Sequence, residues 1–285
     1  MIILIGLATV FGSILLGYTM HHGNLAVLVQ VSEFVIIGGA AIGSLIIANP
    51  PTVIKGIARQ VAGLLKPNPY NERSYSELLQ ALFELFQTAR RDGLIGVERH
   101  IEDPAASDLF KKFPMFRQQT HAVAFLTDTL KVLLAGSMEE YHLSEVLEMD
   151  MERQHEEAMT VPAALGRMGD ALPGFGIIAA VLGVIITMGA ISGPTSEIGA
   201  KVAAALVGTM LGILLSYGVV SPIAQAIESR IRSEQAYLSC IRVALLAYAR
   251  GDSPTTAVEF ARRSIEPADR PSFAVLESLV QRKAA

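Results

Sequence analysis

The stretch VAAALVGTMLGILLSYGVVSPIAQAI, residues 202–227, contains no charged side chain. A helix of about 20 residues, rising about 1.5 Å per residue, crosses the ~30 Å hydrocarbon core of a bilayer. Residues 202–227 therefore have the length and composition of a transmembrane helix. Further apolar runs of this kind occupy residues 2–20, 33–48 and 172–191. The sequence predicts an integral membrane protein with four transmembrane helices.

The first two runs each leave an alternative open. The run at 33–48 is short, and reaches spanning length if Val31 and Ser32 extend it and the Glu33 side chain snorkels to the membrane surface. A buried helix of a soluble domain is the other interpretation of this run. The run at 2–20 resembles a secretory signal peptide in position, but it has neither a basic n-region nor an A-x-A cleavage site.

The basic residues set the predicted topology. Apart from Lys201, every Lys and Arg falls within residues 50–170 or 228–285. Loops that are rich in Lys and Arg stay on the cytoplasmic side of a membrane. We therefore expect transmembrane hairpins at 1–49 and 171–227, with a cytoplasmic helical domain between them, cytoplasmic C-terminal helices, and both termini in the cytoplasm.

The polar segments show helical periodicity and no alternating strand pattern, so the expected fold class is all-α. Ser74-x-x-Glu77 has the spacing of a capping box and predicts that a helix begins there and stops near Gly93. A short helix is expected at 95–101. Further helices are expected at 121–134, at 143–159 and on both sides of the break at 251–254.

The sequence gives little support to an enzyme. It contains no Walker A loop, HExxH, GxSxG or Cys/His cluster, and it predicts neither a cofactor nor a metal site. The chain has one cysteine, Cys240, and therefore no framework of disulfide bonds. Its net charge of -4 is modest and spread along the chain, so the charge pattern does not indicate a nucleic-acid-binding protein. The runs at 172–191 and 202–227 lack the mid-membrane carboxylate that ion relays normally need. If ions cross here, a partner must supply the titrating acid.

Pairs of small residues recur in the apolar runs at a spacing of four. Such residues let helix backbones approach closely in lipid. The pattern predicts tight helix packing, either within one chain or between copies in an oligomer. The pairs are Gly39-x-x-x-Gly43, Gly176-x-x-x-Ala180, Ala179-x-x-x-Gly183 and Gly208-x-x-x-Gly212.

Several separated stretches of the chain resemble the MotA family of flagellar stator proteins, in the MotA/TolQ/ExbB proton channel superfamily. The resemblance runs nearly end to end. The stretches are EFVIIGGAAIGS (33–44), ARRDGLIGVERHIEDP (89–104), GDALPGFGIIAAVLGV (169–184), ALVGTMLGILLSYGVVSP (205–222) and AVEFARRSIEPADRPSF (257–273).

The resemblance implies a stator subunit of the flagellar motor in the bacterial inner membrane. Proteins of this family form a homopentamer around two copies of MotB, whose membrane helix carries a proton-accepting Asp. Ion flow would then turn the pentamer against the rotor protein FliG and drive motility. We expect this arrangement, which agrees with the lack of a mid-membrane carboxylate in the runs 172–191 and 202–227 and with the recurring pairs of small residues.

The resemblance also assigns roles to four residues of the membrane helices. Pro173 and Pro222 match prolines at the ends of the third and fourth helices that couple proton movement to conformational change. Thr209 matches a threonine near the ion route. Ala180 matches a position where sodium-driven relatives have threonine, and because a methyl group cannot ligate sodium, protons are favoured over sodium. The ordinary alternatives are prolines tolerated near helix ends and a threonine bonded to its own helix.

Arg90 and Glu98 match a charged pair of the family that engages FliG. They flank the predicted break at Gly93, which favours an exposed corner where one partner reaches both. The ordinary alternative is a pair of solvated surface charges.

Two other functions stay open at this point. One is an energy-coupling subunit of the ExbB/TolQ type, which has three membrane helices. The other is a non-conducting membrane scaffold whose cytoplasmic helices only recruit partners.

Overall fold

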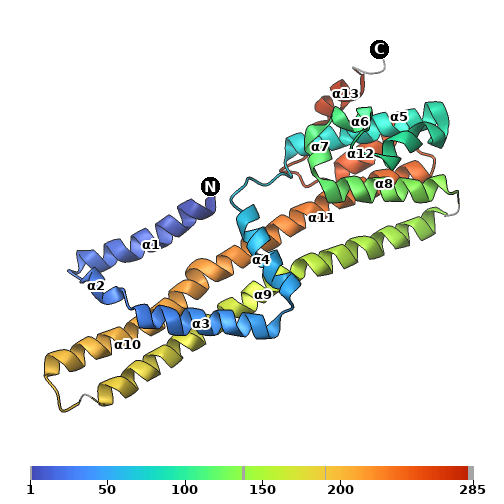
Figure 1. The fold of residues 1–285 in the computed structure, drawn as a ribbon. Coiled ribbons are helices and arrows are strands. Elements are labelled where there is room, and N and C mark those ends of the chain that lie inside the picture. The colour runs from blue at the N-terminus through green and yellow to red at the C-terminus, as the bar shows by residue number, and fades with distance from the viewer. Residues whose placement is uncertain (1, 137–138, 190, 282–285) are drawn as a thin grey trace. The chain divides into compact units, whose positions relative to one another are not determined.

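A computed structural model describes residues 2–136, 139–189 and 191–281 of the chain (Figure 1). All regular structure in these ranges is helical, which confirms the all-α prediction. The chain divides into two compact units. The first consists of the residues up to Pro67 together with Ala158–Ser229, and the second consists of Asn68–Glu157 together with the residues from Arg230 onward.

Four helical stretches are long and apolar enough to cross a membrane, as the sequence predicts. They are α1 (Ile2–Met20), the stretch Leu25–Ala48, the long helix α9 (Glu140–Met188) and the run Thr195–Ala249. The second stretch consists of α2 (Leu25–Leu28) and α3 (Val31–Ala48). The fourth consists of α10 (Thr195–Leu215), the π-helical turn η1 (Ser216–Val220) and α11 (Ser221–Ala249).

The third and fourth membrane helices run past their predicted ends. The helices expected at 143–159 and 172–191 form one helix, α9, which contains Pro162 and Pro173 and ends at Met188. The fourth helix likewise continues beyond Pro222 into α11. A proline removes one backbone donor, and the remaining hydrogen bonds keep the helix continuous. Pro173 therefore lies inside a helix and not at a helix end, whereas the helical continuation after Pro222 agrees with the helix expected before the break at 251–254.

Small residues bring the backbones of α9 and α10 into contact. A Cβ atom built on Gly176 would lie 2.9 Å from the Gly208 carbonyl oxygen, and one built on Gly212 would lie 2.7 Å from the Leu172 carbonyl oxygen. Only glycine allows this approach. By contrast, Cβ atoms on Gly39 and Gly43 of α3 would meet nothing within 4 Å. A Cβ atom on Gly183 would likewise lie 2.6 Å from the Ala205 Cβ atom, so three of the four predicted motifs pack within the chain, while the α3 motif faces open space.

The second unit is built around α5 (Glu72–Glu102), whose buried face carries Leu78, Leu82 and Phe86. The Phe86 ring stacks on Tyr248 with centroids 4.5 Å apart. The other helices that lie wholly in this unit are α6 (Asp108–Lys111), α7 (Pro114–Gln118), α8 (Thr120–Leu134), α12 (Pro254–Ser264) and α13 (Phe273–Gln281). The first unit also contains α4 (Pro51–Gly63).

The predicted capping box is wrong by three residues. Helix α5 begins at Glu72, because the Asn71 side chain accepts from the backbone N–H of Ser74 and the Ser74 hydroxyl accepts from that of Asn71. Glu77 is left to accept hydrogen bonds from the backbone N–H of Met115 and of Phe116, at 2.7 and 3.3 Å. These donors open α7, so Glu77 caps a different helix.

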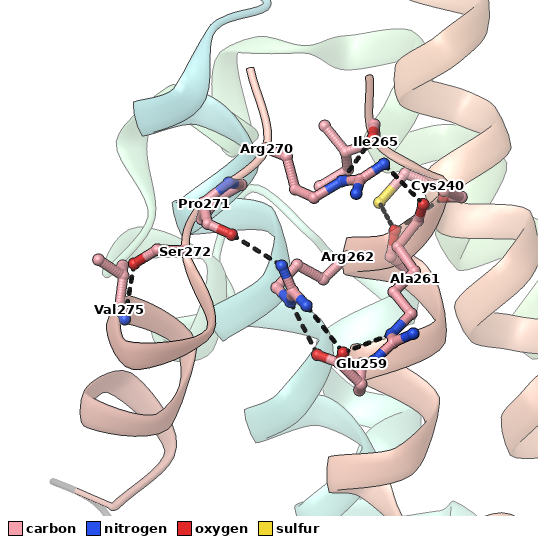
Figure 2. A network of polar contacts seen from close by, with 11 residues as sticks. Cys240, Glu259, Ala261, Arg262, Ile265, Arg270, Pro271, Ser272 and Val275 are labelled. Atoms are coloured by element: carbon pink, nitrogen blue, oxygen red, sulfur yellow. Dashed lines mark hydrogen bonds and ion pairs between the residues drawn. The ribbon is translucent and has the colours of Figure 1, made fainter. Parts of the chain in front are cut away.

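A polar network holds the segment after α12, part of the stretch 257–273 that carries the family resemblance. Glu259 accepts hydrogen bonds from Arg262 and Arg263, with the nearest nitrogen 2.7 Å away, and Figure 2 shows the bonds from Arg262. Arg262 also donates to the Pro271 carbonyl at 3.1 Å, and Arg270 donates to the Ile265 carbonyl at 2.8 Å. These hydrogen bonds therefore hold the segment 265–271, which follows α12, in place within the second unit.

Candidate functional site

The structure brings the backbone around Pro173 next to the residues that precede Pro222. Pro173 has no N–H, so the Gly169 carbonyl four residues earlier lacks its helical donor. A Cβ atom on Gly169 would lie 2.9 Å from the Ser221 hydroxyl oxygen and 3.4 Å from the Val220 side chain. Two breaks in regular hydrogen bonding therefore lie side by side in α9 and the fourth membrane helix.

The π-helical turn η1 lies directly before Pro222. The Ser221 N–H donates to the Ser216 carbonyl, a bond that spans five residues in place of four. The Ser216 hydroxyl is buried and has no hydrogen-bond partner in the described part of the chain. Single π-turns inside α-helices occur frequently at functional sites. The sequence marks this place only through Pro222, and the turn itself was not predicted.

Thr209 and Ala180 lie beside the tight contact between α9 and α10. Both side chains are half-buried. Their neighbours in sequence form the contact: Ala179 is fully buried, and its Cβ lies 3.1 Å from where a Cβ on Gly208 would be. The Thr209 hydroxyl can donate and accept a hydrogen bond, whereas the Ala180 methyl group can do neither. The pair therefore offers one polar group at this level of the helices.

The Glu33 side chain does not snorkel, which corrects the sequence-based expectation. It is 5% exposed, and its Oε2 atom is buried without a hydrogen-bond partner in the described part of the chain. A methyl group on Gly208 would overlap this oxygen, so the absence of a side chain at Gly208 makes room for the carboxyl. The position of Glu33 at the start of an apolar run favours a place at the membrane surface, and nothing in that run indicates that Gly208 of another helix leaves room for the carboxyl group.

The second unit holds the other predicted site residues. Arg90 and Glu98 are both exposed on α5, on either side of Gly93, whose φ of 73° interrupts the helix. This geometry confirms the predicted break. Arg90 also lines a cleft of about 360 Å³ with Leu133, Tyr248 and Asp252. Glu98 is not among the residues that line this cleft.

A buried histidine that the sequence did not single out lies close to Glu98. His100 Nδ1 is 2.9 Å from the Ser107 hydroxyl, and Arg99 Nε donates to His100 Nε2 at 3.3 Å. Burial, followed by the charge of Arg99, lowers the pKa of His100. Because Arg99 donates to Nε2, the neutral ring carries its proton on Nδ1 and donates to the Ser107 hydroxyl, and this contact anchors the helical turn that carries Glu98.

The described residues contain no group of three or more His, Cys, Asp or Glu side chains that could hold a metal ion. The polar groups described above for the membrane helices are the Glu33 carboxyl group and the Ser216, Thr209 and Ser221 hydroxyl groups.

Comparison with known proteins identifies the family. Residues 4–93 match the family described as Motility protein A N-terminal, and residues 117–239 match the MotA/TolQ/ExbB proton channel family. The chain is 36% identical to motility protein A of Salmonella typhimurium and 37% identical to that of Escherichia coli, in each case over 99% of this chain and 95% of the relative. It is 37% identical to chemotaxis protein LafT of Vibrio parahaemolyticus over 96% of both chains.

Two solved structures share the fold. The structure of C. jejuni MotAB matches with a TM-score of 0.78 at 19% identity, over 95% of this chain and 98% of the other. The flagellar MotAB stator complex from Bacillus subtilis matches with a TM-score of 0.70 at 24% identity, over 90% and 92%. With four candidate spans and relatives similar over nearly their whole length, this chain belongs to the MotA/TolQ/ExbB proton channel family, as a flagellar stator protein of the motility protein A type.

Proposed function

We propose that this stator protein converts a proton gradient into torque on the flagellar rotor. It would do so in the bacterial inner membrane, with both termini in the cytoplasm. The observation that carries the proposal is the contact between Gly169 and Ser221, which places the backbone freed by Pro173 beside the π-turn and Pro222. Both membrane helices therefore lack regular backbone hydrogen bonds at this level. The chain is also similar to motility protein A over almost its full length.

A MotB-like partner would supply the principal titrating acid. The apolar parts of α9 and α10 carry no carboxylate at mid-run, and both matching solved structures are described as MotAB. We propose an assembly of five copies of this chain around two copies of the partner. In support, α3 leaves Gly39 and Gly43 facing open space, and α1 has no buried residue, so both helices offer uncovered apolar faces to further subunits.

Protons would act by changing how the membrane helices pack. Moving one charge through 100 mV supplies about 2.3 kcal/mol, which is on the scale of a change in helix packing. A helix bends most easily where its hydrogen-bond ladder is already interrupted, as it is at Pro173 and at η1. Protonation of the partner's acid would thereby shift the fourth helix against α9. Ala180 supplies no oxygen ligand, which favours protons over sodium.

The rotor contact would be made by Arg90 and Glu98. Both are exposed and lie on opposite sides of the bend at Gly93, so one partner surface can meet both charges. Complementary charges on FliG would then fix the register of the contact and speed its formation.

The test uses cells that lack their own stator and express this chain with its MotB-like partner. Motor torque is measured with sodium removed, and then with the proton gradient collapsed at constant sodium. We expect torque to persist without sodium and to vanish with the proton gradient. Torque that follows sodium would contradict proton coupling.

The same experiment addresses the remaining alternatives. A scaffold would insert into the membrane and bind its partner without producing torque under any gradient. An ExbB/TolQ-like subunit has three membrane helices, and it finds no support in the four candidate spans or in the match to the motility protein A N-terminal family.

A further inference from the structure

Glu33 is an acid enclosed by apolar helices. Its side chain is 5% exposed, and its Oε2 atom lies over Gly208 with no hydrogen-bond partner in the described residues. The buried cluster that joins α3, α9 and α10 includes Ile37, Ala179 and Val207. An ionisable group held in this way inside a membrane protein is a candidate functional group.

The contact lies well inside the apolar part of α10. Gly208 follows Val202, the first residue of the apolar run, by six positions, which corresponds to roughly 9 Å along the helix. Gly208 and Ala179 are also direct neighbours in sequence of Thr209 and Ala180, the two residues expected near the ion route. The Glu33 carboxyl therefore lies on the helices that the proposed function assigns to proton movement.

Charged groups on the surrounding helices do not neutralise this carboxyl. On α10, Lys201 shares a face with Gly208 but lies about 10 Å further along the helix, and it pairs with Glu197 at 2.9 Å. On α9, Asp170 is the nearest charged residue and precedes Ala179 by roughly 13 Å along the axis. The other charges on these neighbours within the first unit are Arg167, on the part of α9 from Ala158 onward, and Lys55 and Arg59 of α4, while α2 carries none.

Without a partner, a carboxylate at this position costs far more free energy than a carboxylic acid. The packed contact therefore accommodates the protonated side chain, and ionisation requires α3 to separate from α10. We infer that Glu33 is a proton-binding group of this chain itself, in addition to the acid supplied by the partner. When the contact opens, the O–H bond breaks, the proton passes to water and the carboxylate remains. When the contact closes, the carboxylate takes up a proton again. This inference rests on the proposed function.

The first test compares Glu33→Gln with Glu197→Gln in stator-deficient cells that also express the partner. Glutamine keeps the shape of the side chain but cannot release a proton, and Glu197 is a half-exposed carboxylate of the same membrane unit. We expect Glu33→Gln to lower motor speed at least fivefold at an unchanged amount of membrane-inserted protein, and Glu197→Gln to leave it within twofold. Wild-type speed for Glu33→Gln would overturn the inference.

The second test does not depend on rotation. Infrared spectra of the purified complex with its partner, near neutral pH, should contain the carbonyl stretch of a protonated acid that Glu33→Gln lacks and Glu197→Gln retains. If this band is present but the wild-type motor gives no torque, the proposed function fails while Glu33 stands as a buried protonated acid. Identical spectra for the wild type and Glu33→Gln would overturn the assignment of Glu33.

Discussion

At the scale of single residues, glycine decides where the membrane helices meet. Gly176 and Gly174 lie two positions apart on α9, yet a Cβ on Gly176 would press on the Gly208 carbonyl while one on Gly174 would meet nothing within 4 Å. Backbone atoms cannot move aside as the end of a flexible side chain can. A side chain is therefore excluded at Gly176 but can be accommodated at Gly174.

This difference predicts opposite effects of the same substitution. Gly176→Ala should lower the free energy of unfolding by about 1 to 3 kcal/mol, because the methyl group overpacks the contact between α9 and α10. Gly174→Ala should raise stability by up to about 1 kcal/mol, because alanine favours helix. Thermal unfolding of the purified protein in detergent measures both. Equal effects of the two substitutions would mean that α9 does not pack on α10 at Gly176.

Glu259 makes stability depend on acidity. Hydrogen bonds from Arg262, and then from Arg263, lower the pKa of Glu259 to about 2, while an unfolded glutamate titrates near 4.5. Because the folded pKa is the lower one, the stabilisation is complete above about pH 4.5 and is lost as the pH falls toward 2. The side chain is 22% exposed and Arg263 is 73% exposed, so we expect only about 1 to 2 kcal/mol.

The matching measurement compares unfolding of the wild type with that of Glu259→Gln. The wild type should be the more stable at neutral pH, and the difference should shrink on acidification through the range below about pH 4.5. A difference that does not vary with pH would show that the network in Figure 2 acts through packing and not through charge.

At the scale of elements, sequence periodicity predicts where helices lie better than where they end. The helix expected at 2–20 coincides with α1, and the breaks at Gly93 and Gly251 appear with φ of 73° and 91°. The end expected near Pro173 does not occur, because one missing donor is a smaller loss in lipid than a broken helix. The π-turn and the burial of Glu33 depend on residues of other helices, so no single stretch of sequence indicates them.

Substituting each of the two prolines inside α9 distinguishes an effect on stability from an effect on torque. Pro173→Ala should return a donor to the Gly169 carbonyl and raise the free energy of unfolding by up to about 3 kcal/mol. It should also reduce torque strongly, since the bend beside Ser221 becomes stiffer. Pro162→Ala changes the same helix away from this contact and should leave torque intact. If both variants rotate at wild-type speed, the proposed hinge is wrong.

At the scale of the whole molecule, one chain combines an apolar membrane unit with a polar unit. Helices α9 and α11 each contribute residues to both compact units, so the units are joined by continuous backbone. Apart from Lys201, the Lys and Arg residues lie on the predicted cytoplasmic side, where the rotor is expected. The proposed rotor contact requires that the exposed charges on α5 meet opposite charges on FliG.

Charge reversal at the corner of α5 tests that dependence. Arg90→Glu should reduce motor torque several-fold while membrane insertion and thermal stability stay unchanged, because an exposed side chain contributes little to folding and much to a complementary contact. Arg91→Glu is the matched control, since Arg91 is 75% exposed and already paired with Asp92 at 2.8 Å. Torque should recover when Arg90→Glu is combined with reversal of the opposing charge on FliG. If Arg91→Glu is as harmful as Arg90→Glu, general charge on this corner, and not a specific contact of Arg90, governs the rotor interaction.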